Sequence, residues 1–389
     1  MIANFLIQVR HTHRIHVPII TGERVEFLVG PTNERMRRVV FAEGHVIELN
    51  NQAKHAVTNN EDFWRVHLIF DYVEDHPLTR LVMQPGERVF QTRRSLDLER
   101  EAGARKTPSF IILGAQKSGT TSLHSYICQH PLVLAGKRRE THYFDWRWNN
   151  DPKFVTGDDH HRFYLNFFHM DVLRNRPSLM TGESTPSYLL HSDLVIPRVR
   201  MVVPWVKLLV ILRNPVERAY SHYQMSISTE GTDEQRRVRG LSTYAKMSFP
   251  DIVKEEIEAV ELAGLTPYCD LDKYHKFIRN LPMGHGGHSL ILRGMYCLQL
   301  APWMEAFPSD QLKVLSIGDL KGDAIQVNRS MQEVYSFIGL PPHELEDIEP
   351  KNSRMYEPMD PHIRSILEKF YEPYNNRLFE MLERRLTNW

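Results

Sequence analysis

The pattern of apolar and polar positions divides the chain near residue 108. Upstream, residues 14–73 contain short runs rich in β-branched residues, such as HVPII and VEFLV, separated by turn residues. Such runs are typical of antiparallel strands. We therefore predict a small all-β unit over residues 1–75, a partial jelly roll or fragment of a double-stranded β-helix. The following segment, residues 76–107, is rich in charged residues and is predicted to be a linker.

From residue 108 to residue 389, continuous apolar runs alternate with amphipathic stretches. The runs SFIILGA, VKLLVILRN and LKVLSIGDL have the composition of parallel strands that are buried on both faces. Helices are predicted for residues 215–227, 249–262 and 325–340, and two further helical segments flank Pro373. This alternation predicts an α/β domain in three layers, with a central parallel sheet between helices.

Composition narrows the class of protein. Apolar residues make up 42% of the chain, and the 48 basic residues balance the 48 acidic ones. A net charge of zero argues against a general nucleic-acid binder. No apolar run is long enough to span a bilayer, the start lacks the features of a signal peptide, and the three cysteines are scattered. We therefore expect a cytoplasmic protein with free thiols, no membrane span and no nucleic-acid partner.

The stretch FIILGAQKSGTTSL, residues 110–123, carries the first candidate site. A strand, a glycine turn and a helix start together form an anion site, because backbone N–H groups converge there and the helix dipole favours negative charge. The lysine of an ATP-type P-loop follows the second glycine, whereas here Lys117 precedes Gly119, so a kinase or ATPase is the weaker interpretation. The residues expected to hold the anion in this P-loop-like turn are Gly114, Gln116, Lys117, Ser118, Gly119, Thr120, Thr121 and Ser122.

This stretch resembles the 5′-phosphosulfate loop of sulfotransferases that use 3′-phosphoadenosine 5′-phosphosulfate (PAPS). The segment VKLLVILRNPVERAYSHY resembles the 3′-phosphate motif of the same family, and the resemblance assigns that phosphate to Arg213 and Ser221. The order of RRETHYFDW, GESTPSYLL and FIGLP is similar to the heparan sulfate and bacterial branch. Further nucleotide contacts are implied at Tyr296, Lys351 and Arg354.

The resemblance implies transfer of the sulfuryl group from PAPS to a hydroxyl or an amine, with 3′,5′-diphosphoadenosine (PAP) as the product. Lys117 would stabilise the leaving phosphate, and Glu140 would be the base on the acceptor. In an extended stretch His142 would point to the same side as Glu140 and could share the proton transfer. No metal is required by this chemistry. A non-catalytic nucleotide-binding protein is the alternative.

The acceptor is expected to be a small molecule or a saccharide. In the heparan 3-O-sulfotransferase branch a lysine near the acceptor precedes the TPSY element, whereas this sequence has Ser184 there. A cation on the acceptor side is therefore missing or comes from elsewhere.

The N-terminal strands resemble the second part of aspartyl/asparaginyl β-hydroxylases, which are Fe(II) and 2-oxoglutarate dioxygenases. The resemblance assigns an iron ligand to His55, the 2-oxoglutarate carboxylate to Arg65, and further co-substrate contacts to Arg14 and His16. The proximal ligand of that family has no counterpart, because MIANFLIQ contains no histidine. We expect a truncated remnant without iron chemistry that packs, positions substrate or forms a homodimer, since an open half-roll exposes sheet edges. Hydroxylase activity is the alternative.

Overall fold

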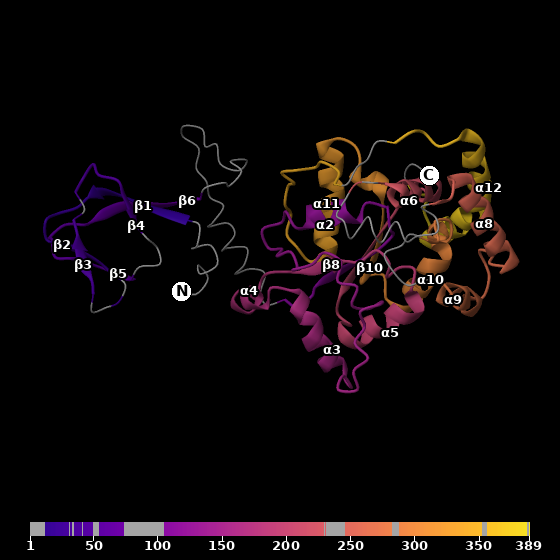
Figure 1. The fold of residues 1–389 in the computed structure, drawn as a ribbon, viewed down its shortest axis with the longest axis horizontal. Coiled ribbons are helices and arrows are strands. Elements are labelled where there is room, and N and C mark those ends of the chain that lie inside the picture. Colours follow the sequence, from indigo (N-terminus) through magenta and orange to yellow (C-terminus); the bar gives the residue numbers. More distant parts are fainter. Residues whose placement is uncertain are drawn as a thin grey trace. The chain divides into compact units, whose positions relative to one another are not determined.

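The computed structural model describes residues 12–30, 32, 35–40, 42–49, 54–73, 105–228, 230, 246–281, 288–351, 356–386 and 389. The chain divides into two compact units, Met1–Phe90 and Gln91–Trp389 (Figure 1). Most of the predicted linker, residues 76–107, lies outside the described residues, so its boundaries stay a prediction.

The N-terminal unit contains two small antiparallel sheets. One has the strand order β4-β1-β6 and the other has the order β3-β2-β5. Its buried core centres on Phe27, which packs against Val29, Val39 and Ile47. The strands are β1 (Thr12–Ile20), β2 (Val25–Gly30), β3 (Arg37–Val39), β4 (Ile47–Leu49), β5 (Lys54–Asn59) and β6 (Val66–Val73). The prediction of an antiparallel β unit is confirmed.

The larger unit is built on a four-stranded parallel sheet with the order β10-β9-β7-β8. Its strands are β7 (Phe110–Gly114), β8 (Gly182–Ser184), β9 (Lys207–Leu212) and β10 (Leu312–Ser316). All five residues of β7 are buried, as expected for a strand covered on both faces. Figure 1 shows α2 and α11 on one side of the sheet, and α3 and α5 on the other. The predicted three-layer α/β fold is confirmed.

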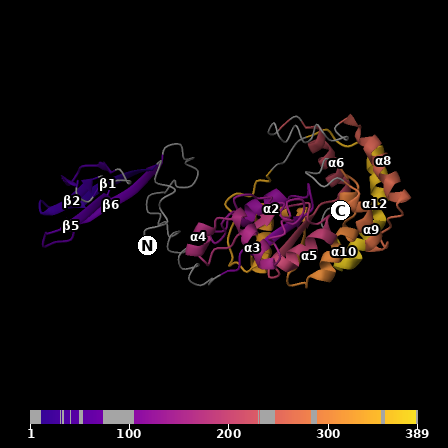
Figure 2. The ribbon, with the colours of Figure 1, turned by 60° about the horizontal axis from the view of Figure 1, so that its bottom comes forward.

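In this unit α6 and α8 have the predicted bounds, and α11 differs from its prediction by one residue at its start and two at its end. Helices α3, α4, α5, α9 and α10 were not predicted. Figure 2 shows α6, α8, α10 and α12 gathered at one end of the sheet. The helices are α2 (Thr120–Ile127), α3 (Gly157–Tyr164), α4 (Met170–Asn175), α5 (Ser192–Val202), α6 (Pro215–Ile227), α8 (Phe249–Leu262), α9 (Leu271–Arg279), α10 (Tyr296–Ala306), α11 (Ala324–Ile338) and α12 (Pro361–Leu382).

The prediction of two helical segments around Pro373 is wrong, because α12 runs through this proline. A proline inside a helix removes one backbone hydrogen bond and favours a break. Here tertiary contacts hold both sides of the proline. The hydroxyl of Tyr371 donates to the Ile291 carbonyl at 2.7 Å, and that of Tyr374 donates to the Leu265 carbonyl at 2.5 Å.

The strand order places the first candidate loop at a switch point of the sheet. The chain passes from β7 to its neighbour β8 on one side, and then to β9 on the other side. In open α/β sheets, ligands bind at the carboxyl ends of strands where the connections diverge in this way. The turn after β7 lies at this point, and the residues that follow β8 and β9 lie beside it.

Candidate active site

The turn between β7 and α2 has the backbone geometry of an anion site. Lys117 and Gly119 both have positive φ angles, 67° and 97°. Gly119 is the N-cap of α2, and no side chain caps the first turn of this helix, which also contains no acidic residue. The N–H groups of that turn thus point out of the helix end, where they attract an anion. A Cβ on Gly114 would lie 2.9 Å from the Pro186 carbonyl oxygen, so this position requires glycine.

The segment after β9 lies directly against this turn. Nη1 of Arg213 and Nη1 of Arg218 donate to the carbonyl oxygens of Lys117 and Gln116, each at 3.5 Å. Arg218 is fully buried, and the sequence analysis missed its role. The two arginines hold the carbonyl side of the turn. The structure therefore brings together the two loops that the sequence assigned to one nucleotide.

Ser221 is the residue predicted to bind the 3′-phosphate together with Arg213, and Tyr296 is a further predicted nucleotide contact. Ser221 is buried on α6, two helical turns further on. The hydroxyl of Tyr296 donates to the Arg213 carbonyl at 2.9 Å. Arg213 also lies 3.8 Å from the Glu217 carboxylate, which in turn pairs with Arg364 at 2.5 Å. An acidic side chain thus already balances the cation that is predicted to bind the 3′-phosphate.

Two predicted nucleotide contacts at the C-terminal side stay predictions. The ammonium of Lys351 pairs with Asp347 at 2.5 Å, so its charge points to a neighbour. Its backbone N–H donates to Ser122 Oγ at 3.0 Å, which fixes this segment on α2. Arg354 lies outside the described residues. The side chains of Ser118 and Thr120 are buried beside the turn.

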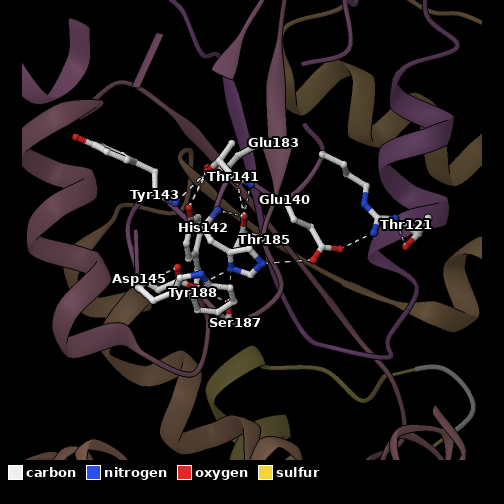
Figure 3. A network of polar contacts seen from close by, with 12 residues as sticks. Thr121, Glu140, Thr141, His142, Tyr143, Asp145, Glu183, Thr185, Ser187 and Tyr188 are labelled. Carbon is white, nitrogen blue, oxygen red and sulfur yellow. Dashed lines mark hydrogen bonds and ion pairs between the residues drawn. The ribbon is translucent and has the colours of Figure 1, made fainter. Parts of the chain in front are cut away.

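Glu140 and His142 lie together, but not in the way that an extended stretch predicts. His142 has a positive φ of 52°, so the backbone turns at this residue. Its Nε2 lies 3.5 Å from Oε2 of Glu140, and its Nδ1 lies 3.1 Å from Oδ2 of Asp145 (Figure 3). Ser187 Oγ donates to the same Asp145 oxygen at 2.6 Å, and the Trp146 ring stacks on the imidazole at 3.5 Å between centroids. The imidazole is therefore fixed from three sides.

The sequence analysis missed Asp145 and Ser187. Asp145 lies within the quoted segment RRETHYFDW, three residues after His142, and Ser187 lies within GESTPSYLL. The spacing of Glu140, His142 and Asp145 in that segment is the sequence feature that could have indicated this group. Only the fold shows that Ser187, which lies 42 residues from Asp145 in the sequence, completes the group.

Glu140, His142 and Asp145 form a row of contacting side chains, the Glu140 row, and its electrostatics favour an ionised Glu140. Burial by itself would raise the pKa of Glu140, but the bond from His142 and the charge of Arg139 outweigh it and lower that pKa. Burial would lower the pKa of His142, but the bonds to Asp145 and Glu140 outweigh it and raise that pKa. The row therefore consists of a carboxylate, an imidazole that gains affinity for a proton, and a second carboxylate.

The buried carboxyl group of Glu183 holds the backbone near Glu140 and His142 in place. Glu183, at the centre of β8, is fully buried, and burial raises its pKa. Its partners include Thr141, which lies between Glu140 and His142 in the sequence, and Thr185 (Figure 3). The hydroxyl donors to its two oxygens are Thr141 at 2.7 Å, Tyr164 at 2.5 Å, Tyr188 at 3.1 Å and Thr185 at 2.5 Å. Thr141, between Glu140 and His142, is thus anchored to the sheet.

Three of the four residues predicted from the hydroxylase resemblance, His16, His55 and Arg65, lie around Phe27 on the smaller unit. His55 stacks on Phe27 at 6.0 Å between centroids, Arg65 Nε donates to His67 Nε2 at 3.0 Å, and His16 is buried against Phe27. Arg14 lies on β1 and pairs in register with Leu49 and Asp71. Within the described part of the chain, no three His, Cys, Asp or Glu residues are grouped so that they could hold a metal ion. Among the residues that the structure describes, no group of ligands around His55 therefore completes the iron site of the resemblance.

The chain matches the family model described as "Sulfotransferase domain" over residues 107–356. Among solved structures, the sulfotransferase from Alicyclobacillus acidocaldarius is similar to this chain, with 23% identity, a match over 73% of this chain and 99% of that one, and a TM-score of 0.48. The residues matched by the family model include β7, the anion turn, the Glu140 row and the Arg213 segment. The chain belongs to the sulfotransferase family.

Three curated relatives are similar at the level of sequence. The membrane-associated sulfotransferase kil1 of Dictyostelium discoideum is 24% identical over 71% of this chain and 65% of its own length. The bifunctional heparan sulfate N-deacetylase/N-sulfotransferase 3 of Homo sapiens is 26% identical over 75% of this chain and 32% of its own length. The heparan sulfate glucosamine 3-O-sulfotransferase 5 of Mus musculus is 24% identical over 73% and 75%. The chain thus spans between about a third and three quarters of these relatives.

The expectation of a cytoplasmic protein is wrong. It relied on the lack of an apolar span and of a leader in the sequence, whereas the Dictyostelium relative is named as membrane-associated. Among the helices that the structure describes, none combines the length and the apolar character needed to cross a bilayer.

Proposed function

We propose that this protein is a PAPS-dependent sulfotransferase. The observation that carries the proposal is the contact between the two loops, where Arg213 Nη1 lies 3.5 Å from the carbonyl oxygen of Lys117. One nucleotide with phosphates at both ends of its ribose can then contact both loops. The Glu140 row adds a base at the same edge of the sheet, which an ordinary nucleotide-binding protein does not need.

The proposed reaction is an in-line displacement at sulfur. An acceptor oxygen or nitrogen forms a bond to sulfur, and the bond between sulfur and the 5′-phosphate oxygen breaks with its electrons going to PAP. The acceptor proton passes to Glu140, and His142 shares or holds it. Lys117 and the N-terminus of α2 stabilise the negative charge that develops on the leaving phosphate.

The acceptor that we favour is a saccharide hydroxyl or amine. Two of the relatives carry heparan sulfate in their names, one as an N-sulfotransferase and one as a 3-O-sulfotransferase. A small-molecule acceptor is the alternative. Trp146, which stacks on His142 beside Glu140 and is partly exposed, offers an aromatic ring on which a sugar ring could lie.

The test of the proposed function is the binding and use of PAPS. PAP is expected to raise the melting temperature of the protein, and Lys117→Ala is expected to abolish this shift. Incubation with labelled PAPS and a panel of saccharides and metabolites, followed by mass spectrometry, should then reveal a product with an added sulfuryl group. Binding of PAP without transfer to any acceptor, or to water, would identify a non-catalytic nucleotide-binding protein. Turnover of 2-oxoglutarate that depends on Fe(II) and on His55 would favour the hydroxylase instead.

A further inference from the structure

Arg139 joins the anion turn to the proposed base. Its Nη1 donates to the hydroxyl of Thr121, in the first turn of α2, and its Nη2 donates to Oε1 of Glu140 at 2.5 Å. Figure 3 shows Thr121, Glu140 and His142 in one row. The guanidinium therefore spans the space between the loop that would hold the leaving phosphate and the carboxylate that would face the acceptor.

The backbone of Arg139 is fixed as firmly as its side chain. Its carbonyl oxygen accepts a hydrogen bond from the N–H of Ser184 at 2.8 Å, so the residue is attached to the carboxyl end of β8. Two residues on, Thr141 is held by Glu183. The position of the arginine thus follows from the sheet and does not depend on the side-chain contacts alone.

The geometry of an in-line displacement decides what such a bridging cation touches. The leaving oxygen, the sulfur and the attacking atom lie on one line, and the other three sulfuryl oxygens lie around the middle of that line. The anion turn marks the leaving end and Glu140 marks the attacking end. A cation in contact with both ends therefore lies beside the sulfuryl oxygens.

Arg139 has donors to spare for these oxygens. A guanidinium carries five N–H donors in one plane, and the contacts with Thr121 and Glu140 use one donor each. The side chain is 33% exposed, so a ligand can reach it. A planar fork of donors also suits a group of several oxygens better than a single ammonium does.

We propose that Arg139 is a catalytic residue that binds the sulfuryl oxygens of the donor and stabilises them while the group moves from the 5′-phosphate to the acceptor. This inference rests on the proposed function. Arg139 would supply the cation that is absent at Ser184, since the two residues are joined through the backbone. Ser184 is small and buried, which leaves the space in front of β8 to the arginine.

A consequence concerns the base. In the unliganded protein the charge of Arg139 contributes, together with the bond from His142, to the lowered pKa of Glu140. A sulfuryl group on the arginine shares that charge, which makes Glu140 a better proton acceptor when the donor is bound. The base would then be strongest at the moment when it is needed.

PAPS and PAP differ only in the sulfuryl group, so their affinities separate the role of Arg139 from that of the nucleotide loops. Calorimetric titrations of the wild-type protein, Arg139→Gln and Arg139→Lys with each nucleotide would test the proposal. Arg138→Gln is the matched control, because Arg138 is the exposed neighbour. We expect PAP to bind every variant with nearly wild-type affinity, while Arg139→Gln weakens PAPS about tenfold or more, as for a lost charge-assisted hydrogen bond. Arg139→Lys is expected to lie between the two.

The outcomes separate the proposals. Equal losses of PAP and PAPS affinity in both Arg139 variants would mean that the arginine serves the nucleotide loops or the fold, and would overturn the inference. An unchanged ratio of the two affinities would overturn it as well. If the wild-type protein binds neither nucleotide, the proposed function itself is wrong. Arg139→Lys keeps the charge and serves as the measured variant if Arg139→Gln does not fold.

Discussion

Oε2 of Glu140 lies 3.5 Å from Nε2 of His142, and the opposite nitrogen of the same ring lies 3.1 Å from Asp145. An imidazole between two carboxylates can accept a proton from one side while the other side holds its orientation. The carboxylate of Glu140 is the end of this row that is open to an acceptor, since its side chain is 27% exposed and that of Asp145 is completely buried. The predictions below follow from this row and from the loops beside it.

Replacement of the base should stop transfer and spare nucleotide binding. For Glu140→Gln we expect the rate of transfer from PAPS to fall by about two to four orders of magnitude, the range typical of a lost general base. The melting-temperature shift with PAP should persist, because Glu140 faces the acceptor. Transfer at the wild-type rate by this variant would remove Glu140 from the mechanism.

Asp145→Asn should lower the pKa of His142. Burial opposes the protonated imidazole, and the bonds to Asp145 and Glu140 outweigh that effect and raise the pKa above 6.5. A raised pKa in the folded state contributes stability that is complete below the unfolded pKa and disappears as the pH rises through the folded one. The variant should therefore lose more stability at pH 5.5 than at pH 8.5.

The measurement for Asp145→Asn is an NMR titration of the His142 ring protons, combined with thermal unfolding at both pH values. A purely steric effect would destabilise the variant equally at both. Such a result, with an unshifted imidazole titration, would contradict the charge-based account of this row.

Removal of the buried carboxylate should destabilise the larger unit. Glu183→Ala leaves several buried hydroxyl groups without their acceptor, and we expect a loss of about 3 kcal/mol or more in the free energy of unfolding. Glu183→Gln keeps the shape and is the matched control, with a smaller loss. Urea unfolding followed by circular dichroism would measure both.

The same pair of variants reports the sign of the Glu183 titration. Burial raises the pKa of this carboxyl from 4.5, so its protonated form is favoured by folding, and the stability that this contributes is lost as the pH rises through the folded pKa. The deficit of Glu183→Gln relative to the wild type should therefore shrink with rising pH. A deficit that grows with pH would show that the ionised carboxylate is the stabilising form.

Arg213→Ala should reduce the preference for a 3′-phosphate. The wild-type protein is expected to bind PAP more tightly than AMP, and the variant should lose about tenfold or more of that preference, as for a lost charge-assisted hydrogen bond. Competitive titrations with the two nucleotides measure the ratio. Arg364→Ala is an informative control, because Arg364 pairs with Glu217, the carboxylate that also lies beside Arg213.

The sequence pattern predicts most of the central sheet and several of its helices. Continuous apolar runs identified β7 and β9, because strands buried on both faces leave few polar positions. The run at β10 was also identified, although this strand contains Lys313 and only its last two residues are buried. The three-residue strand β8 carried no such pattern, since its sequence is GES and its central glutamate is buried. The proline in α12 misled the prediction because local propensity opposes a helix that tertiary contacts hold together.

The candidate site also combines features that the sequence predicts with features that only the tertiary structure decides. Glycines, a lysine and hydroxyls between a strand and a helix determined the anion turn, because adjacent residues build it and its chemistry is local. The order of the strands determined the rest, since it brings Arg213 to Lys117 across 96 residues and Ser187 to Asp145 across 42. The path of Arg139 from Thr121 to Glu140 likewise exists only once α2 and β8 lie on the same edge of the sheet. A sequence specifies which side chains are present, and long-range packing decides which of them meet.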